Sequence, residues 1–389
     1  MQMIERAITP VFRRVSGQYP VVTLTGPRQC GKTTLARHLF PDWDYVNMES
    51  PLMRAEFRDD PQGFLNRHAA PCIFDEIQNT PELASYLQVI VDERRENGLY
   101  ILTGSHQPAV RSVITQSLAG RTAMLQLLPL SMEELAGAGL PTGRDELLLR
   151  GFLPRLYNDL ELPAYEAYEN YYMTYVERDV SSFVNLRQAS AFDTFMRLLA
   201  GRIGQEVNYS SLSGDTGVSV TTVREWMSIL TACYIIYPLQ PYFVNAGKRL
   251  VKSPKIYFTE PGLAAYLLKI HKPEHVAQHP LVGNLFENMV VSELLKAACN
   301  RKSVASLYFY RDKGGLEVDA VIDSGAELTP VEIKSAYSYN SRFTDNIAAF
   351  RKLYPAARDG AVVYSGEPIE AGSGHPAWCH FTRAGGLLP

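Results

Sequence analysis

The chain has 389 residues, of which 46% are apolar and 20% are charged, and its formal net charge is −3. This length is enough for two or three domains, each with its own core. The small negative charge excludes a protein that binds nucleic acid through an overall basic surface, so such binding would need a local basic patch. No segment contains the ~20 consecutive apolar residues of a membrane span, and we expect no membrane contact.

The cysteines and the N-terminal residues predict a cytoplasmic protein. Residues 1–14 are charged and lack a long apolar core, which is typical of a helix packed under the first domain rather than of a signal peptide. The cysteines are odd in number, scattered and without a C-x-x-C pair: Cys30, Cys72, Cys233, Cys299 and Cys379. Such usage indicates buried thiols in a reducing compartment rather than disulfides or a zinc site.

The first strand and helix enclose a complete phosphate-binding motif, G-x-x-x-x-G-K-[ST]. A buried strand is expected over 21–25 and a helix over 34–39. Backbone N–H groups of such a loop and the helix N-terminus attract phosphate, and glycines avoid Cβ clashes. The complete motif disfavours an ordinary glycine-rich turn and predicts contacts to ATP from Gly26, Pro27, Arg28, Gln29, Cys30, Gly31, Lys32, Thr33 and Thr34. Lys32 would reach the β- and γ-phosphates, and the Thr33 hydroxyl would ligate Mg²⁺.

The next predicted strand, over 72–75, ends in two carboxylates. Asp75 could hold the Mg²⁺ through water, and Glu76 could orient or deprotonate the attacking water. An apolar strand followed by Asp-Glu is by itself more often a strand that runs into a solvated turn. Here it follows a complete phosphate loop, so the pair predicts a nucleoside triphosphatase.

A third buried strand, over 99–103, ends at polar residues. A side chain of Thr103 or Ser105 would lie beside the Asp75 strand and near the γ-phosphate.

Arg121 is expected between a helix over 110–118 and a strand over 122–128. An arginine in this place can face the nucleotide of a neighbouring subunit and stabilise charge in the transition state, which predicts a homo-oligomer. The alternative is a salt bridge at the surface or between domains.

The order of elements divides the chain into three domains with an overall α/β fold. Residues 1–140 alternate strand and helix, which predicts a parallel sheet with helices on both faces. Residues 141–275 are mostly helical, and residues 276–389 combine a helix with several strands. A tyrosine-rich stretch over 164–184 has helical spacing and predicts packing in a core or interface, with base stacking as the alternative.

The middle region contains a helix-turn-helix pattern over 210–230. Strands expected over 234–242 and 256–258 enclose a basic stretch and would form the hairpin wing of a winged helix. The four cations of this wing, Lys248, Arg249, Lys252 and Lys255, favour contact with double-stranded DNA. Winged helices also serve as protein-contact modules, and Glu225 offsets Arg224 on the second helix, so a protein partner is the alternative.

The last region places charged residues together on two strands. Glu332 and Lys334 are two residues apart and share one face of a strand, and Asp319 is expected on the neighbouring strand. Two carboxylates can hold Mg²⁺ for phosphodiester hydrolysis, with the lysine positioning water or stabilising charge, and Glu287 from a helix could complete the set. The alternative is a buried ion pair of Lys334 with Glu332 or Asp319.

Taken together, these motifs resemble a bacterial and archaeal family that joins an AAA+-type ATPase domain to a C-terminal domain of unknown function with a PD-(D/E)XK nuclease-like fold. The resemblance covers nearly the whole chain and is carried by residues 24–34, 74–78, 103–105, 118–121, 283–288, 317–319 and 331–335. It implies nucleotide-site roles for Lys32, Thr33, Asp75, Glu76 and Ser105 or Thr103, a finger role for Arg121, and a nuclease-type set of Glu287, Asp319, Glu332 and Lys334. Val318 replaces the proline that usually precedes the aspartate of this nuclease motif, which neither excludes nor supports activity.

Two functional hypotheses follow. In the first, an oligomeric ATPase uses ATP and Mg²⁺ to couple nucleotide hydrolysis to the handling of double-stranded DNA, and its C-terminal domain is a Mg²⁺-dependent nuclease. In the second, the chain is an ATP-gated binding switch for a protein or nucleic-acid partner, and its nuclease-like domain is catalytically inactive.

Overall fold

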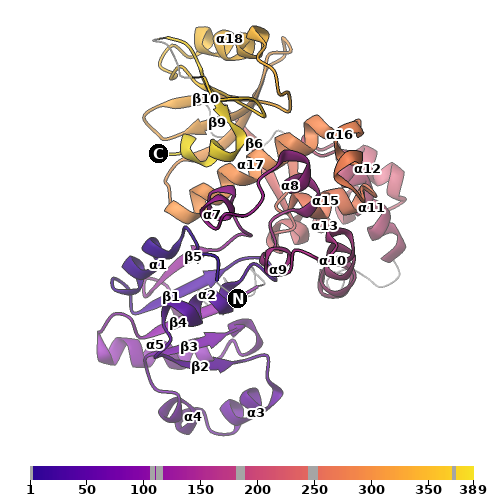
Figure 1. Cartoon of the computed structure of the whole chain (residues 1–389). Coiled ribbons are helices and arrows are strands. Elements are labelled where there is room, and N and C mark those ends of the chain that lie inside the picture. Colours follow the sequence, from indigo (N-terminus) through magenta and orange to yellow (C-terminus); the bar gives the residue numbers. More distant parts are fainter. Residues whose placement is uncertain (1–2, 106–109, 111–116, 181–188, 244–252, 370–373) are drawn as a thin grey trace. The chain divides into compact units, whose positions relative to one another are not determined.

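The computed structural model describes residues 3–105, 110, 117–180, 189–243, 253–369 and 374–389 (Figure 1). The chain divides into two compact units. The N-terminal unit consists of Met3–Pro129 and Cys299–Lys302, and the C-terminal unit of Leu130–Ala298 and Ser303–Pro389. Within the described ranges, no helix is both long and apolar enough to cross a membrane.

The N-terminal unit is built on a five-stranded sheet in the order β2-β3-β4-β1-β5, and all neighbouring strands run parallel. Its strands are β1 (Val21–Thr25), β2 (Asp44–Asn47), β3 (Cys72–Asp75), β4 (Tyr100–Gly104) and β5 (Thr122–Gln126). Its helices are α1 (Thr9–Ser16), α2 (Lys32–Leu39), α3 (Pro51–Asp59), α4 (Pro61–Arg67), α5 (Leu83–Arg94) and the 3₁₀ turn η1 (Ile77–Asn79). The prediction of a parallel sheet in this part of the chain is confirmed; of the helix expected over 110–118, residues 111–116 lie outside the described residues.

Helices cover both faces of this sheet because its strands are apolar on both sides. Successive strand residues enter different cores, since their side chains point to opposite faces. Val22, Ile73 and Ile101 pack with Phe12 of α1 and Leu35 of α2. On the other face, the strand residues Val21, Phe74 and Tyr100 pack with side chains of α3, α4 and α5: Phe57, Phe64 and Leu87.

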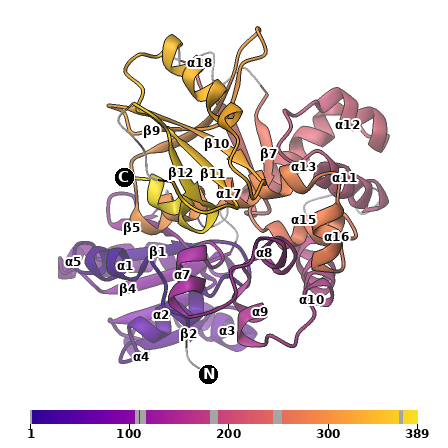
Figure 2. The ribbon, with the colours of Figure 1, turned by 45° about the horizontal axis from the view of Figure 1, so that its top comes forward.

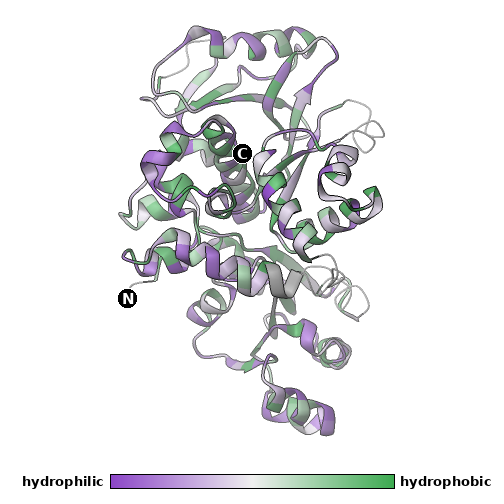
Figure 3. Ribbon diagram, turned by 90° about the vertical axis from the view of Figure 1, so that its right-hand side faces the viewer, coloured by the Kyte–Doolittle hydropathy of each residue, from purple (hydrophilic) through white to green (hydrophobic). Residues whose placement is uncertain are grey.

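The C-terminal unit begins with helices and ends with a mixed sheet (Figure 2). Its helical segments before the sheet are α7 (Met132–Gly137), α8 (Arg144–Arg150), α9 (Pro154–Asn158), α10 (Ala164–Tyr171), the π-helical η2 (Tyr172–Val180), α11 (Ala189–Gly201), α12 (Tyr209–Thr216) and α13 (Val220–Ala232). The later ones are α15 (Pro261–Leu267), α16 (Pro273–Gln278), α17 (Val282–Arg301), η5 (Ser341–Thr344), α18 (Asp345–Leu353) and η6 (Phe381–Leu387). Hydrophilic and hydrophobic residues alternate along many helices, as expected for helices with one buried face (Figure 3).

The C-terminal sheet has seven strands in the order β12-β11-β10-β9-β8-β6-β7. They are β6 (Ile236–Pro241), β7 (Lys255–Phe258), β8 (Ser306–Arg311), β9 (Glu317–Asp323), β10 (Leu328–Lys334), β11 (Ala361–Tyr364) and β12 (Ala377–His380). β8, β9 and β10 pair antiparallel, whereas β10, β11 and β12 pair parallel, and α18 packs on β9 and β10. A division into domains at residue 275 stays a prediction, and this sheet takes strands from both sides of that point.

The helix-turn-helix pattern corresponds to α12 and α13, which pack against each other. Asn208 and Ser219 cap their N-termini, and Gly217, at φ 71°, ends α12 in the left-handed conformation that glycine adopts easily. The strands expected to form a wing are β6 and β7, which pair antiparallel at the edge of the seven-stranded sheet. Residues 244–252, with most of the basic stretch, lie outside the described residues.

We predict opposite stability effects for two glycine-to-alanine changes in C-terminal helices. A Cβ on Gly262, in α15, would lie 2.3 Å from a ring carbon of Tyr168, which is buried and donates its hydroxyl to the Arg150 carbonyl. Gly262→Ala should lower the free energy of unfolding by about 2 kcal/mol through overpacking. A Cβ on Gly214, in α12, would meet open space, so Gly214→Ala should raise it by roughly 0.5–1 kcal/mol. Urea unfolding measures both, and equal effects would contradict the packing of Tyr168 on α15.

Candidate functional site

The phosphate loop leaves β1 with a backbone that few residues besides glycine can adopt. Gly26 has φ 152° and Gly31 has φ 94°, and Gln29 between them has φ 63°. A Cβ on Gly26 would lie 1.9 Å from the carbonyl oxygen of Leu127. The loop is therefore packed tightly against the chain that follows β5, and it opens directly into α2.

Lys32, the first residue of α2, is 5% exposed. Its Nζ donates hydrogen bonds to the carbonyl oxygens of Gly26 at 3.0 Å and Pro27 at 2.8 Å. The ammonium group is thus held over the loop that precedes it, where the motif requires a cation beside phosphate. The residues of the loop therefore fit a nucleoside triphosphate, which Lys32 and the loop N–H groups would contact.

A buried arginine that precedes α1 in the chain supports the phosphate loop. Arg6 is 4% exposed, and its guanidinium donates to the carbonyl oxygens of Cys30 at 2.8 Å and Leu128 at 2.6 Å. Sequence reasoning missed Arg6, because both acceptors are backbone groups far along the chain and no motif marks the donor.

Three hydroxyl groups converge on the carboxylate of Asp75 at the end of β3. The Thr33 hydroxyl, from α2, donates to it at 2.9 Å and 3.0 Å, and the Tyr45 hydroxyl, from β2, at 2.9 Å. Thr103, from β4, makes the third hydrogen bond. The structure thus brings together the two residues predicted to hold Mg²⁺, Thr33 and Asp75. Tyr45 was not foreseen; burial first, and then the Asp75 charge, raise the pKa of its phenol well above the usual value.

Glu76 has φ 56°, a left-handed conformation uncommon for a residue with a side chain. Its Oε2 accepts hydrogen bonds from the Ser105 backbone N–H at 3.2 Å, from the Ser105 hydroxyl at 3.0 Å and from the Gln78 amide. Thr103 accepts from the Glu76 N–H at 3.2 Å. Thr103 therefore contacts both Asp75 and Glu76, Ser105 contacts Glu76, and the carboxylate of Glu76 is held in one orientation.

Two arginines of the predicted site lie farther out. Arg28 approaches Glu49 at 3.8 Å, with both side chains exposed. Arg121 precedes β5, at the sheet edge opposite to the phosphate loop, and its guanidinium contacts Asp92 at 2.6 Å and 2.8 Å. This hydrogen bond lowers the pKa of the Asp92 carboxyl. Since Arg121 lies across the sheet from its own chain's loop, a role in catalysis would have to be played on another subunit.

In the C-terminal unit, Lys334 joins the two carboxylates expected beside it. Its Nζ lies 2.8 Å from Asp319 Oδ2 and 2.6 Å from Glu332 Oε2. Asp319 also accepts a hydrogen bond from the Ile333 backbone N–H at 2.8 Å, and Asn346 donates to Glu332 at 3.5 Å. Asp319, Glu332 and Lys334 therefore lie together on paired strands, as predicted, and form a compact ion-paired cluster.

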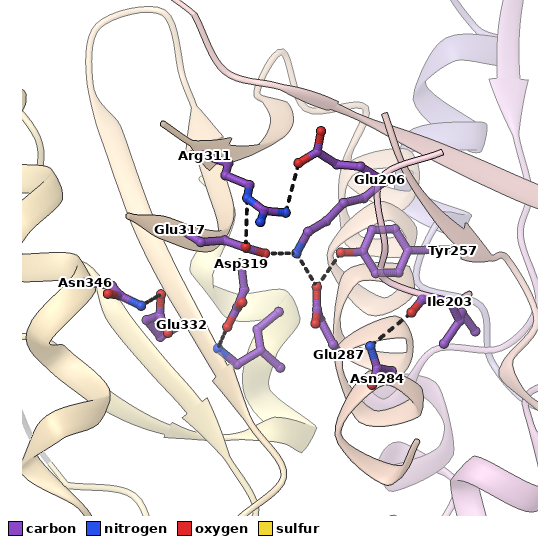
Figure 4. A network of polar contacts seen from close by, with 12 residues as sticks. Ile203, Glu206, Tyr257, Asn284, Glu287, Arg311, Glu317, Asp319, Glu332 and Asn346 are labelled. Carbon is purple, nitrogen blue, oxygen red and sulfur yellow. Dashed lines mark hydrogen bonds and ion pairs between the residues drawn. The ribbon is translucent and has the colours of Figure 1, made fainter. Parts of the chain in front are cut away.

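Glu287 takes part in a separate set of contacts (Figure 4). Its carboxylate accepts hydrogen bonds from Tyr257 and, at 3.1 Å, from Lys255, which also contacts Glu317 at 2.6 Å. Lys255 is 3% exposed, so this cation, expected in the basic wing, is instead buried and ion-paired. Sequence reasoning missed Tyr257 and Glu317, because their proximity to Glu287 depends on the docking of α17 beside β7.

Burial and mutual repulsion raise the pKa of two of these carboxyl groups. Burial, with the charge of Asp319, raises the pKa of Glu332 to about 8 and that of Glu287 to about 7. Across the described part of the chain, no three His, Cys, Asp or Glu side chains form a group that could hold a metal ion. The structure thus divides the predicted metal ligands Glu287, Asp319 and Glu332 between two lysines.

Comparison with known protein families finds three consecutive matches. Residues 18–136 match the AAA domain model, residues 142–274 a domain of unknown function (DUF8612), and residues 282–378 another (DUF4143). The chain thus carries an AAA-type ATPase domain. The match of its last region is to a domain of unknown function, and a nuclease-like fold there stays a prediction.

Similar proteins occur in mycobacteria and archaea. The uncharacterized proteins Rv2008c of Mycobacterium tuberculosis and Mb2031c of Mycobacterium bovis are each 30% identical over 327 residues, covering 83% of this chain and 72% of theirs. The uncharacterized protein MJ1637 of Methanocaldococcus jannaschii is 28% identical over 175 residues, covering 43% of this chain and 35% of its own.

Solved structures with similarity include two archaeal proteins. The Walker-type ATPase PABY2304 of Pyrococcus abyssi is 14% identical, with a TM-score of 0.47, and the match covers 68% of this chain and 96% of that one. The signal transduction ATPase PH0952 of Pyrococcus horikoshii is 13% identical, with a TM-score of 0.23, covering 76% of this chain and 47% of that one.

We predict that Glu332 makes the folded chain less stable as pH rises. Its pKa is raised from 4.5 to about 8, so the folded state keeps a proton that the unfolded state loses, and stability falls between these values. Glu332→Gln should therefore reduce the fall in melting temperature from about pH 5 to about pH 8. Exposed Glu161, changed to Gln, is the control. Identical pH profiles for wild type and Glu332→Gln would contradict the raised pKa.

Proposed function

The chain belongs to the same family as the uncharacterized mycobacterial proteins Rv2008c and Mb2031c, and we propose that it hydrolyses ATP and uses the nucleotide state to switch the binding of a partner. The observation that carries the ATPase proposal is the convergence of Thr33, Tyr45 and Thr103 on Asp75 beside a complete phosphate loop. This arrangement joins the loop that would hold the phosphates to the strand that would hold the metal.

Each residue of the site has a role in this proposal. Lys32 and the loop N–H groups bind the phosphates, and Thr33 and Asp75 would hold Mg²⁺. The ion supplies charge neutralisation on the phosphate oxygens. Glu76, kept in place by Ser105 and Gln78, accepts a proton from the attacking water or orients it.

The contacts in the C-terminal unit favour a binding switch over a nuclease. Lys334 contacts both Asp319 and Glu332, and Lys255 contacts both Glu287 and Glu317, so these carboxyl groups already have partners. We therefore propose that this unit recognises a protein or nucleic-acid partner. Assembly into a homo-oligomer, with Arg121 facing a neighbour's nucleotide, and contact of residues 244–252 with double-stranded DNA remain parts of the proposal.

A Mg²⁺-dependent nuclease is the second candidate function. It is favoured by one observation, the juxtaposition of Asp319, Glu332 and Lys334 on paired strands. The two candidates differ in whether Lys334 acts only as a counter-ion.

We predict that two substitutions separate ATP binding from ATP hydrolysis. Lys32→Ala should weaken ATP binding at least about 10-fold, because a charge-assisted contact to phosphate is lost. Glu76→Gln should retain binding but lower turnover by about 100-fold or more, because an amide cannot accept the proton. Equilibrium titration with ATP and steady-state phosphate release measure the two effects. Glu96→Gln, at an exposed position in the same unit, is the control. Normal turnover by Glu76→Gln would show that another group activates water.

We predict that the purified chain leaves DNA intact. Linear and plasmid DNA incubated with Mg²⁺ and ATP should show no cleavage by wild type, since the carboxylates are ion-paired. Cleavage by wild type that Lys334→Ala abolishes would contradict the switch and establish the nuclease. In the same samples, ATP turnover with and without DNA reports whether double-stranded DNA is the partner.

A further inference from the structure

A cavity of about 340 Å³ lies in the N-terminal unit among α3, the start of α4 and the chain that leads into α5. None of its lining residues belongs to the phosphate loop. α3 contributes Arg54, Phe57 and Arg58, which lie three and four residues apart and thus on one helix face. Thr80 and Tyr86 line it from the other side.

Two of the residues that line this cavity each have a buried polar atom without a hydrogen-bond partner. These atoms are Nε of Arg54 and Oγ1 of Thr80. The Thr80 residue as a whole is only 5% exposed. Buried donors are normally paired, so two unpaired ones on residues that line one cavity indicate a place prepared for an acceptor.

The charge and shape of the cavity define that acceptor. Arg54 and Arg58 form no ion pair among the residues that the structure describes, and Glu82 is the one carboxylate in the lining. Two guanidinium groups favour an oxyanion, which they can bind through paired hydrogen bonds. The rings of Phe57 and Tyr86, packed edge to face with centroids 5.5 Å apart, add aromatic surface to the lining.

We propose that this cavity binds a small organic oxyanion, a carboxylate or phosphate carried on a flat apolar body. Arg54 and Arg58 bind the charged head, and the Thr80 hydroxyl donates to one of its oxygens. The apolar body packs against Tyr86, whose side chain is 40% exposed.

The position of Thr80 also links the cavity to Glu76. The 3₁₀ turn Ile77–Asn79 connects the two residues, and the Thr80 N–H bonds to the Ile77 carbonyl at 3.0 Å. Gln78, within this turn, donates to the Glu76 carboxylate. A ligand held by Thr80 therefore restricts the turn that orients Glu76, which makes the cavity an effector site; this regulatory step rests on the proposed function, whereas ligand binding does not.

Binding of benzoate to the purified full-length chain tests the proposal. Calorimetric titration should show saturable binding of benzoate, with weaker binding of acetate, which lacks the ring. Phenyl phosphate, titrated into the Lys32→Ala variant to avoid the phosphate loop, distinguishes a phosphate from a carboxylate ligand. Arg54→Gln and Thr80→Val should each weaken binding of the preferred probe about 10-fold or more. Arg13→Gln, which removes an exposed arginine of the same unit, should leave it unchanged.

The two pocket variants, Thr80→Val and Arg54→Gln, allow the proposal to be contradicted. Thr80→Val preserves shape and removes a hydroxyl without a partner, so its melting temperature should not fall, and it carries the test if Arg54→Gln fails to fold. Absence of saturable binding by all three probes, or binding that neither pocket variant weakens, would overturn the site. Ligand binding without any change in ATP turnover would overturn only the effector role.

Discussion

The carboxylate of Asp75 is the interaction on which the N-terminal unit depends. It receives hydroxyl groups from α2, β2 and β4, so one buried side chain connects the phosphate-loop helix to three parallel strands. Thr33 is the member of this set that would turn from Asp75 to a metal ion, while Tyr45 and Thr103 keep the carboxylate in place. An apolar residue at position 75 would leave these hydroxyls unpaired, so fold and site share one constraint.

The C-terminal unit is held by a different kind of interaction, in which lysines lie between carboxylates. Lys334 and Lys255 each join two acidic residues on different strands or helices. Glu293 of α17 also accepts the Met132 backbone N–H at 2.9 Å, and Glu260 accepts that of Phe152 at 2.8 Å, which fixes the start of this unit to its later helices. Removing one member of such a pair is costly, because it leaves a buried charge without a partner. The same pairing explains why these acidic residues form no metal-binding group within the described residues.

Local patterns predicted much of the fold and the centre of the candidate nucleotide site. The phosphate loop, Asp75 and Glu76 were found because their chemistry requires fixed residues next to apolar strands. Tyr45, Arg6 and the cavity at Thr80 were not found, because each depends on groups that tertiary packing brings together from distant positions. For Lys255, the same dependence on tertiary packing made a prediction wrong. Its basic neighbours indicated an exposed wing, but a strand position beside α17 buries it against Glu287.

The most direct test of the account is the effect of Mg²⁺ on ATP binding by wild type and by Asp75→Asn. Asp75 and Thr33 are placed to hold the ion, so Mg²⁺ should tighten ATP binding by wild type. Replacing the carboxylate with an amide should remove most of this dependence while the phosphate loop still binds ATP. Equal Mg²⁺ dependence in both proteins, or no ATP binding by wild type, would contradict the assignment of this site.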